Sequence, residues 1–458
     1  MAKIINLFEK QKFFDFYFNG LNDKYFDYFL TTDLGKIYMS FPWEKYVSYY
    51  RKEFRRRKVK KGRERKFSIR TEIALLVLMS VTGLSDRRLW EELKSNIYYQ
   101  LFCGIILLPE YKTGNWKILS DIRRRYGKIS NIFELQDLSA DHWREYLKEQ
   151  NGVLMDATVF SSDIHYPVTY NLLQQVLDWL VNWYVKYREI LGEKVSLKLY
   201  EREKHQYSII RKKRRIGRNE RRALERRQLK LISRYIKSVE SVVVALEKIG
   251  VKMREDFLRR LSTARKIYEL YQSERRKGSE LILNFRRPYV RAIYRGKAGK
   301  KWEYGQKWHS FMLGNMVFVD KESSENYNES GRLVSVVDRS ERYIGCSIKL
   351  LGADRIYGTN YNRSYCSSRG ILTNFVAKGR RGKNEKDLSE VRRAIEGRRS
   401  GLMEGIFGVL KRQYNTERIR YIGKWTERLI VFLAMMSYNS VIMSKWRMSQ
   451  ESSLRQTG

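Results

Sequence analysis

A short apolar run at residues 152–160 constrains the fold of this 458-residue chain more than any other segment. It is rich in β-branched residues, which predicts a buried β-strand. A helical pattern follows it, with apolar residues at helix spacing from Leu172 to Leu191. Strand-like runs return only near Trp302–Phe311 and Met316–Asp320. One strand, a long helical stretch and then more strands predict an α/β fold whose sheet is interrupted by a helical insertion.

Two further strands and a closing pair of helices are predicted beyond residue 346. The strands are expected at Ser347–Asp354 and Ile371–Val376. A long helix that contains Glu404 follows them, and an apolar helical segment, Leu429–Met436, comes last. The insertion after the first strand is expected at about 165–285, and long antiparallel helices would account for its pattern.

The region before the first strand is predicted to contain a packed pair of helices, from Ile69 to about Leu101. The first helix is apolar on nearly all sides and should be buried; Gly83 should end it, and Ser85 should cap the second helix. The second helix would bury Leu89, Trp90 and Leu93 and expose Arg87 and Arg88. This arrangement is compatible with a DNA-binding helix-turn-helix, although packed helix pairs also occur in every other class of protein.

The charge balance favours a polyanionic partner. Lys and Arg total 92 against 51 Asp and Glu, which gives a formal net charge of +41. Such an excess is costly for a compact state because like charges repel, and nucleic acid is the partner that would compensate it. An anionic membrane is the alternative, but the best apolar run, Leu75–Val81, is far shorter than the roughly 20 residues that span a bilayer. Residues 1–12 do not have the apolar stretch of a signal peptide.

Two runs carry the basic residues at high density. Arg51–Arg70 leads into the helix pair and is expected to be a DNA-binding arm, with a solvated linker as the alternative. Arg211–Lys230 is expected to track DNA phosphates, unless it is only a solvated helix face. The residues assigned to DNA contacts in these runs are Arg56, Arg57, Arg211 and Arg214.

Several familiar kinds of site are excluded by their patterns. The glycine-rich basic loop Lys378–Lys383 lacks the spacing of a nucleotide-binding P-loop, so a phosphate clamp that uses Arg380 and Arg381 is the expected role. The three cysteines are widely separated and the four histidines are dispersed, which indicates neither a disulfide framework nor a zinc finger. Reduced cysteines and a basic chain favour a cytoplasmic protein.

Three acids are the candidate catalytic residues. Asp156 and Asp354 lie on or at the end of apolar strands, and Glu404 lies on a helix fifty positions after Asp354. A carboxylate on a buried strand is costly unless it is paired or binds a cation. Three carboxylates that converge on one sheet edge would suit Mg²⁺, and two such ions can activate the attacking oxygen and stabilise the leaving one. The alternative is that these acids are helix N-caps or ion-pair partners of the many arginines.

Five blocks, in this order, resemble the transposases of bacterial insertion sequences that have an RNase H-like DDE catalytic domain. They are Met155–Thr158 with Ile164–Pro167; Arg295–Ala298 with Glu303–Lys307; Ala353–Tyr357 with Asn362, Arg363, Gly370 and Ile371; Met403–Gly408 with Lys411 and Tyr414; and Asn439 in the closing helix. The helix pair around Gly83–Asp86 is also similar, so the resemblance covers most of the chain from about residue 67.

The resemblance implies a fold and a division into domains. The fold would be an RNase H-like mixed sheet with flanking helices, a helical N-terminal region and a helical insertion after the first catalytic strand. The domains would be an aromatic and basic N-terminal segment at 1–66, a helical DNA-binding region at 67–150, the catalytic domain at 151–445 and a polar tail at 446–458.

It also implies roles for single residues. Asp156, Asp354 and Glu404 would hold two Mg²⁺ ions, for which Mn²⁺ can substitute. Lys411 lies two turns beyond Glu404 on the same side of the helix and would contact transposon-end phosphates. Arg399 and Lys297 would also contact DNA, although the related pattern places its basic residue where this chain has Ser400. A rival third acid, Glu396, lacks the Phe-Gly and Lys that follow Glu404.

The expected function is transposition, by hydrolysis of a phosphodiester at each element end and attack of the freed 3′-hydroxyl on target DNA. The partners would be double-stranded DNA, at inverted-repeat ends and at the target, and a second copy of the chain, because two ends are handled together. The protein would act in the bacterial cytoplasm, at the nucleoid. Two alternatives stay open: an RNase H-like structure-specific nuclease without strand transfer, and a non-enzymatic, domesticated DNA-binding protein.

Overall fold

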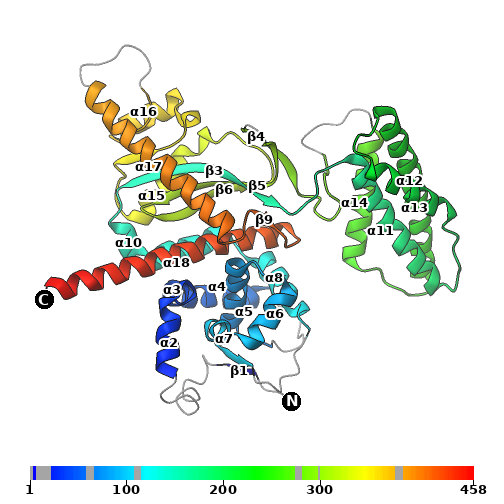
Figure 1. Ribbon diagram of the computed structural model, residues 1–458, viewed down its shortest axis with the longest axis horizontal. Helices are drawn as coiled ribbons and strands as arrows, with labels where there is room; N and C mark the ends of the chain where they lie inside the picture. Colours follow the sequence, from blue (N-terminus) through cyan, green and yellow to red (C-terminus); the bar gives the residue numbers. More distant parts are fainter. Residues whose placement is uncertain are drawn as a thin grey trace. The chain divides into compact units, whose positions relative to one another are not determined.

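The computed structural model of the protein describes residues 4–6, 22–57, 66–107, 115–273, 281–297, 300–376 and 385–457. The chain forms two compact units, whose elements are labelled in Figure 1. Unit 1 consists of residues 1–162 and 306–458, and unit 2 consists of residues 163–305. The insertion expected at about 165–285 lies within unit 2.

The part of unit 1 that precedes the sheet is almost entirely helical. Its elements are β1 (Ile4–Asn6), α2 (Asn22–Thr31), α3 (Asp33–Ser40), α4 (Trp43–Arg56), α5 (Ile69–Thr82), α6 (Asp86–Ser95), α7 (Ile97–Cys103), β2 (Ile105–Leu107), α8 (Lys117–Ile129), α9 (Ile132–His142) and α10 (Arg144–Lys148). β1 and β2 form a small antiparallel pair, with Ile4 opposite Leu107.

Helices α5 and α6 begin and end where the local sequence signals predict. Gly83 ends α5 in the left-handed conformation (φ +60°), and a Cβ there would clash with the side chain of Asn415, so the position requires glycine. Ser85 caps α6 by accepting a hydrogen bond from the Arg88 N–H at 3.3 Å. The buried residues of α6 are Leu89, Trp90 and Leu93, as predicted, while Arg87 and Arg88 are exposed and form ion pairs with Glu91 and Glu92.

In the described part of the chain the sheet has seven strands and contains both parallel and antiparallel pairs. They are β3 (Gly152–Ser162), β4 (Arg291–Lys297), β5 (Lys300–Leu313), β6 (Met316–Ser323), β7 (Leu350–Gly352), β8 (Leu372–Thr373) and β9 (Arg418–Ile419). Their order is β4-β5-β3-β7-β8, with β6 paired to β5 and β9 paired to β3. β3 and β8 are both parallel to β7, and β6 is antiparallel to β5. The expectation of an α/β fold with a mixed sheet is confirmed.

Two strands are much shorter than predicted. The strand expected at Ser347–Asp354 is only β7, and the one expected at Ile371–Val376 is only β8. Beyond β7 the backbone bends into a 3₁₀ turn, η3 (Arg355–Tyr357), so ladder pairing stops. The side chain of Asn374 replaces it, because its amide bonds to both the N–H and the C=O of Ala353, at 3.0 and 2.7 Å.

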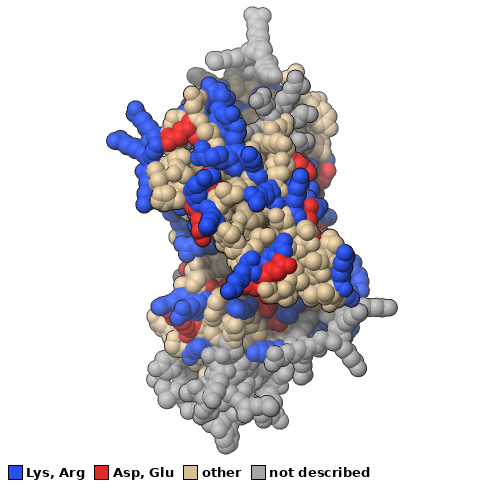
Figure 2. Space-filling model, turned by 90° about the vertical axis from the view of Figure 1, so that its right-hand side faces the viewer, with Lys and Arg blue, Asp and Glu red and all other residues tan. Residues whose placement is uncertain are grey.

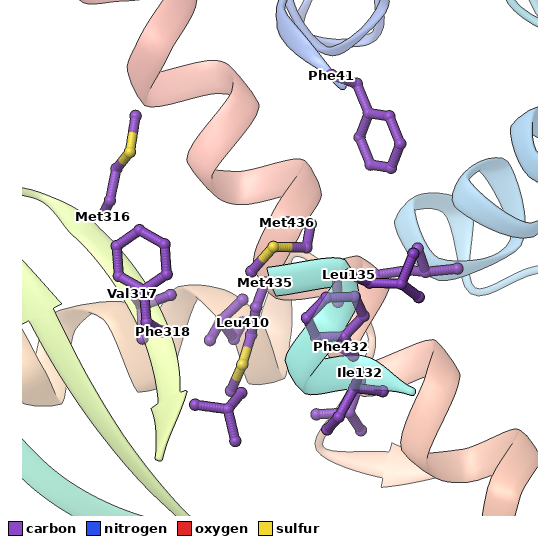
Figure 3. Close-up of a cluster of buried hydrophobic side chains, with 14 of the residues drawn as sticks. Phe41, Ile132, Leu135, Met316, Val317, Phe318, Leu410, Phe432, Met435 and Met436 are labelled. Atoms are coloured by element: carbon purple, nitrogen blue, oxygen red, sulfur yellow. The ribbon is translucent and has the colours of Figure 1, made fainter. Parts of the chain in front are cut away.

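The remaining helices of unit 1 join the sheet to the N-terminal region. They are η2 (Ser330–Arg332), α15 (Leu333–Ile344), α16 (Asn360–Ser368), α17 (Glu385–Arg412) and α18 (Lys424–Thr457). α17 packs on β3 and β7, whereas α18 packs against α3, α5, α8 and β6. Figure 3 shows part of the resulting core, to which α9, β6, α17 and α18 contribute Ile132, Leu135, Val317, Phe318, Leu410, Phe432 and Met435. The N-terminal helices and the sheet therefore share one hydrophobic core, in which each buried large side chain contributes about 1.5–3 kcal/mol.

Helix α18 corrects one expectation from the sequence. Leu75–Val81 was expected to be the most apolar run. Among the described residues, the helix that is long and apolar enough to cross a membrane, by length and composition alone, is α18. However, 78% of the apolar window of α18 is buried inside the protein. Its apolar character is therefore explained by its central place in the core of unit 1.

Two buried amide side chains complete the hydrogen bonding of β6 on the side away from β5. Asn439 of α18 accepts a hydrogen bond from the N–H of Val317 and donates one to its C=O, both at 2.8 Å. Gln136 of α9 forms the equivalent pair with Val319, at 2.6 and 2.9 Å. Because an unpaired strand edge in the core would leave backbone groups unsatisfied, these amides allow β6 to be covered by helices.

Asn439→Leu should lower the free energy of unfolding by about 2–4 kcal/mol, because it leaves two buried backbone groups without partners. Urea unfolding of the variant and wild type measures this loss. Ser440→Ala is the control, since the buried Ser440 hydroxyl bonds only to the Met436 C=O within the same helix and should cost less than about 1 kcal/mol. Equal losses in the two variants would contradict this account of the edge.

Unit 2 is a helical bundle followed by one strand and the start of β5. Its helices are α11 (Thr169–Ile190), α12 (Lys198–Lys212), α13 (Arg218–Lys248) and α14 (Glu255–Gln272). α13 packs along α11 and against α14. The core of unit 2 includes Leu173, Leu177 and Leu180 from α11, Ile232, Val239 and Leu246 from α13, and Ala264 and Ile267 from α14. The strand β4 pairs with residues 302–305 of β5 in antiparallel register.

The basic run at Arg51–Arg70 is not one extended arm. Its first residues form the end of α4, and Arg70 lies in α5, where its guanidinium stacks on the ring of Trp43. Residues 58–65 lie outside the described part of the chain. The first residues of this run are helical because Tyr49, Tyr50 and Glu53 give α4 a face that is buried in the core of unit 1.

Candidate active site

Strand β3 carries Asp156 in the middle of the sheet. The residues on either side of Asp156, Met155 and Ala157, are buried, whereas the Asp156 side chain is 23% exposed. Its Oδ1 accepts a hydrogen bond from the backbone N–H of Ala157 at 2.7 Å. Thr158 lies two residues further along the strand, so its side chain shares the face that carries Asp156. This face is the one on which the candidate site is built.

Asp354 follows β7, the parallel neighbour of β3, and is held from both sides. Ala353, the residue before it, is paired with the side chain of Asn374. After it, the N–H of Tyr357 donates to the C=O of Asp354 at 3.0 Å, and the Asn362 amide donates to the C=O of Tyr357 at 2.8 Å. Asp354 itself is exposed and caps the turn by accepting from the Arg355 N–H. It therefore lies two residues beyond β7, and not at the end of the strand as expected.

Helix α17 crosses this part of the sheet and contacts β3 at two places. Near its middle, Nη1 of Arg399 lies 3.6 Å from Oδ2 of Asp156. Three turns later, Nζ of Lys411 donates to the Thr158 hydroxyl at 2.9 Å. Glu404 lies between these two contacts, is exposed, and has no hydrogen bond or ion pair to any described residue. Since seven residues are nearly two helical turns, Glu404 shares with Lys411 the side of α17 from which Lys411 reaches β3.

Arg399 is the cation closest to Asp156 among the described ion pairs, and Glu396 holds it. Nη2 and Nε of Arg399 donate to the Glu396 carboxylate, at 2.6 and 3.2 Å, and Glu396 also accepts a hydrogen bond from Asn374. This guanidinium keeps the pKa of Glu396 below its usual value. Glu396 therefore lies close to the residues that hold Asp354, but its charge is already compensated.

The electrostatics of Asp156 disfavour its ionised form. Burial raises the pKa of Asp156, and the negative charges of Glu329 and Asp354 raise it further. The Ala157 N–H and the Arg399 guanidinium act in the opposite direction without cancelling the rise. A cation that binds here would relieve this repulsion. Perturbed carboxylates of this kind are common at catalytic and metal-binding sites.

The donor chemistry of these acids fits a hard divalent cation, since all three offer carboxylate oxygens. The structure brings Asp156 and Asp354 within electrostatic reach of each other. In the described ranges, however, no group of three His, Cys, Asp or Glu side chains is arranged to hold a metal ion, so the three acids do not form a preassembled ligand set. The helix that carries Glu404 nevertheless packs on the two strands concerned.

Sequence reasoning missed several residues around these acids. Glu329, whose charge acts on Asp156, forms an ion pair with the buried Lys307 at 2.6 Å. His309, dismissed as one of four dispersed histidines, is fully buried beside Asp320 and Tyr357. Lys307 and His309 are polar residues two positions apart, on one face of the strand predicted at Trp302–Phe311. That pattern is the signal that could have identified them.

The residues assigned to DNA contacts have different surroundings. Arg56, Arg57, Arg211 and Arg214 are exposed. Arg399 is buried and paired with acids, so its position favours a role within the site over a contact with DNA. Arg380 and Arg381 lie outside the described residues, and Lys297 is described only in its backbone, at the end of β4.

Comparison with known families identifies the N-terminal helices of unit 1. Residues 28–125 match the model of a transposase domain (DUF772), over about a fifth of the chain. The match includes the last four residues of α2, all of α3 to α7 and most of α8, and it crosses the domain boundary expected at residues 66 and 67. It supports a transposase and, through that family, DNA as the substrate. No curated protein and no solved structure matches the chain.

Proposed function

We propose that the protein is a DNA transposase of the DDE type, which cleaves DNA at the ends of a mobile element and joins the freed 3′-hydroxyl to target DNA. One observation carries the proposal: Asp156 and Asp354, on and after adjacent parallel strands, interact electrostatically in a chain that has a transposase-domain match. Helix α17, which bears Glu404, packs on both strands. This order of elements supports the RNase H-like arrangement that the sequence resembles.

The three acids would hold one or two divalent ions, Mg²⁺ or Mn²⁺. Bound ions would supply activation of the attacking oxygen and stabilisation of the leaving oxygen. The chain's own residues would do the rest by positioning. Arg399 compensates Asp156 when no cation is bound, and Glu396 keeps Arg399 in place. Lys411, on the side of α17 that bears Glu404, would contact a phosphate of the bound DNA.

A strand-transfer assay tests this function. The substrate is a DNA fragment with the inverted repeats that flank the gene, incubated with the protein, Mg²⁺ and a target plasmid. We expect new 3′-hydroxyl ends and joined products, formed by a dimer because two ends are handled together. Cleavage without joining would instead identify a structure-specific nuclease. Binding without cleavage would identify a domesticated DNA-binding protein.

The basic run of unit 2 forms an exposed stripe that supports DNA as the partner. Along α13 a basic residue occupies every fourth position, each exposed, at Arg218, Arg222, Arg226, Lys230 and Arg234. Sixteen residues of helix extend about 24 Å, so the stripe could contact several phosphates of one backbone. Figure 2, which faces the side where Figure 1 labels α12 and α13, shows more blue Lys and Arg side chains than red acidic ones.

Replacement of Arg222, Arg226 and Lys230 by Gln should weaken DNA binding and make its salt dependence shallower. Each lost phosphate contact reduces the slope of log K against log salt by about 0.9, so up to roughly 2–3 units are expected. Binding isotherms at several salt concentrations give this slope. The control replaces Arg259, Arg260 and Lys266, exposed residues of α14, with Gln. If both triple variants lose the same affinity, the stripe has no special role.

A further inference from the structure

A chain of buried polar side chains connects β6, β5 and the turn that carries Asp354. Asp320, His309 and Tyr357 are almost fully buried. Nδ1 of His309 lies 2.9 Å from Oδ2 of Asp320, and its Nε2 lies 2.7 Å from the Tyr357 hydroxyl. That hydroxyl in turn lies 3.2 Å from Oε2 of Glu329. The imidazole is therefore held at both nitrogens, and the chain ends at the candidate site.

A β-bulge aims Asp320 into this chain. In the antiparallel pair of β5 and β6, His309 lies opposite Lys321 and Ser310 lies opposite Val319. Asp320 is thus an extra residue between the partners of two consecutive β5 residues. In a regular strand its side chain would point to the face opposite that of His309. The bulge turns it toward the imidazole instead.

The carboxylate of Asp320 is fixed by further partners. Arg332 donates to both of its oxygens, at 2.7 and 3.0 Å, and the Ser335 hydroxyl donates at 2.7 Å. Although burial acts to raise it, these bonds and the one with His309 hold the pKa of Asp320 far below its usual value. Asp320 is consequently a rigid, charged anchor for His309.

Stability alone does not account for such a chain. Buried charged groups cost several kcal/mol in desolvation, and well-packed apolar residues of the same size are often as stable or more so. This series of hydrogen-bonded side chains instead fixes the positions of groups at the candidate site. Tyr357 closes the Asp354 turn with its backbone N–H, and its hydroxyl faces Glu329, whose charge acts on Asp156.

We propose that His309 and Tyr357 are positioning residues of the candidate site. His309, anchored by Asp320, fixes the ring of Tyr357, and Tyr357 fixes both the Asp354 turn and the Glu329 carboxylate. This inference rests on the proposed function and adds to it the residues that hold the second acid in place. Loss of such supporting residues typically weakens metal binding or activity about 10–100-fold.

The test is Tyr357→Phe, which keeps the ring and removes only the hydroxyl. Mn²⁺ binding to the full-length protein without DNA is measured by titration calorimetry, beside thermal unfolding. We expect Mn²⁺ to bind about tenfold more weakly. Tyr343→Phe is the matched control, because the buried Tyr343 hydroxyl also bonds a carboxylate, that of Asp137, and the amide of Gln136. It should lower the melting temperature but leave Mn²⁺ affinity unchanged.

A second variant, His309→Gln, repeats the test from the other side of Tyr357 and should weaken Mn²⁺ binding in the same direction. If both variants fold and bind Mn²⁺ as wild type does, the positioning role is wrong. If neither variant folds, these hydrogen-bonded side chains are needed for folding itself, and the inference is also wrong. If Asp156→Asn binds Mn²⁺ as tightly as wild type, the proposed function fails instead, whatever the two positioning variants do.

Discussion

Asp156→Asn should give a protein that folds and binds DNA but cleaves and joins strands at least about 100-fold more slowly than wild type. Removal of residues that only orient a metal ligand costs about 10–100-fold, so loss of a ligand should cost more. Asparagine keeps the size of the side chain and still accepts the hydrogen bond from the Ala157 N–H. It removes the negative charge that a divalent cation needs.

A gel assay of cleavage and joining in Mg²⁺ or Mn²⁺, beside a binding isotherm on the same DNA, checks this result. Affinity for DNA should be unchanged or slightly higher, because a negative charge near the phosphates is lost. Thr158→Val is a suitable control for substitution on the same face of β3, since it removes a hydroxyl that bonds Lys411 but no charge. Wild-type cleavage by Asp156→Asn would refute the DDE mechanism.

Glu404→Gln should also slow cleavage at least about 100-fold, with little effect on the free energy of unfolding. Glu404 is exposed and has no ion pair to a described residue, so its charge contributes little to folding. In the proposed mechanism Glu404 is the third metal ligand, and it lies on α17 between the Arg399 contact with Asp156 and the Lys411 contact with Thr158. Circular dichroism on heating and the cleavage assay separate these two effects.

Glu396→Gln is the matched variant, eight residues earlier on the same helix. Glu396 is ion-paired with Arg399, so its loss should free the guanidinium and lower stability, while cleavage stays within about tenfold of wild type. If Glu396→Gln abolishes cleavage and Glu404→Gln does not, the third acid is Glu396. This pair of variants thus decides between the two acids that the sequence offered.

Local signals predicted those features whose cause lies within a few residues. The apolar run with β-branched residues around Asp156 predicted β3, and the Gly83 turn with the Ser85 cap predicted the end of α5 and the start of α6. The apolar spacing at Leu172–Leu191 predicted α11. In each case the backbone preference and the burial pattern are properties of neighbouring residues.

Strand lengths near Asp354 could not be predicted in this way. The run Ser347–Asp354 looks like a strand throughout, but a strand persists only while its backbone stays extended beside its partner, and here the backbone bends into η3. Here β8 is two residues long and the Asn374 amide replaces the ladder at Ala353. The exposure of Asp354 is a consequence of this early bend.

The sequence by itself determined the mixed α/β class, the positions of α5, α6, α11, α17 and α18, the excess positive charge and the strand that carries Asp156. Only the tertiary structure decided which polar residues meet. Arg399 lies one position from the expected basic site yet reaches Asp156, and Lys411 reaches Thr158 across 253 residues of sequence. His309 meets Asp320 and Tyr357 because a one-residue bulge changes the direction of a side chain. Periodicity describes the face of one element, whereas these contacts depend on register and packing between elements.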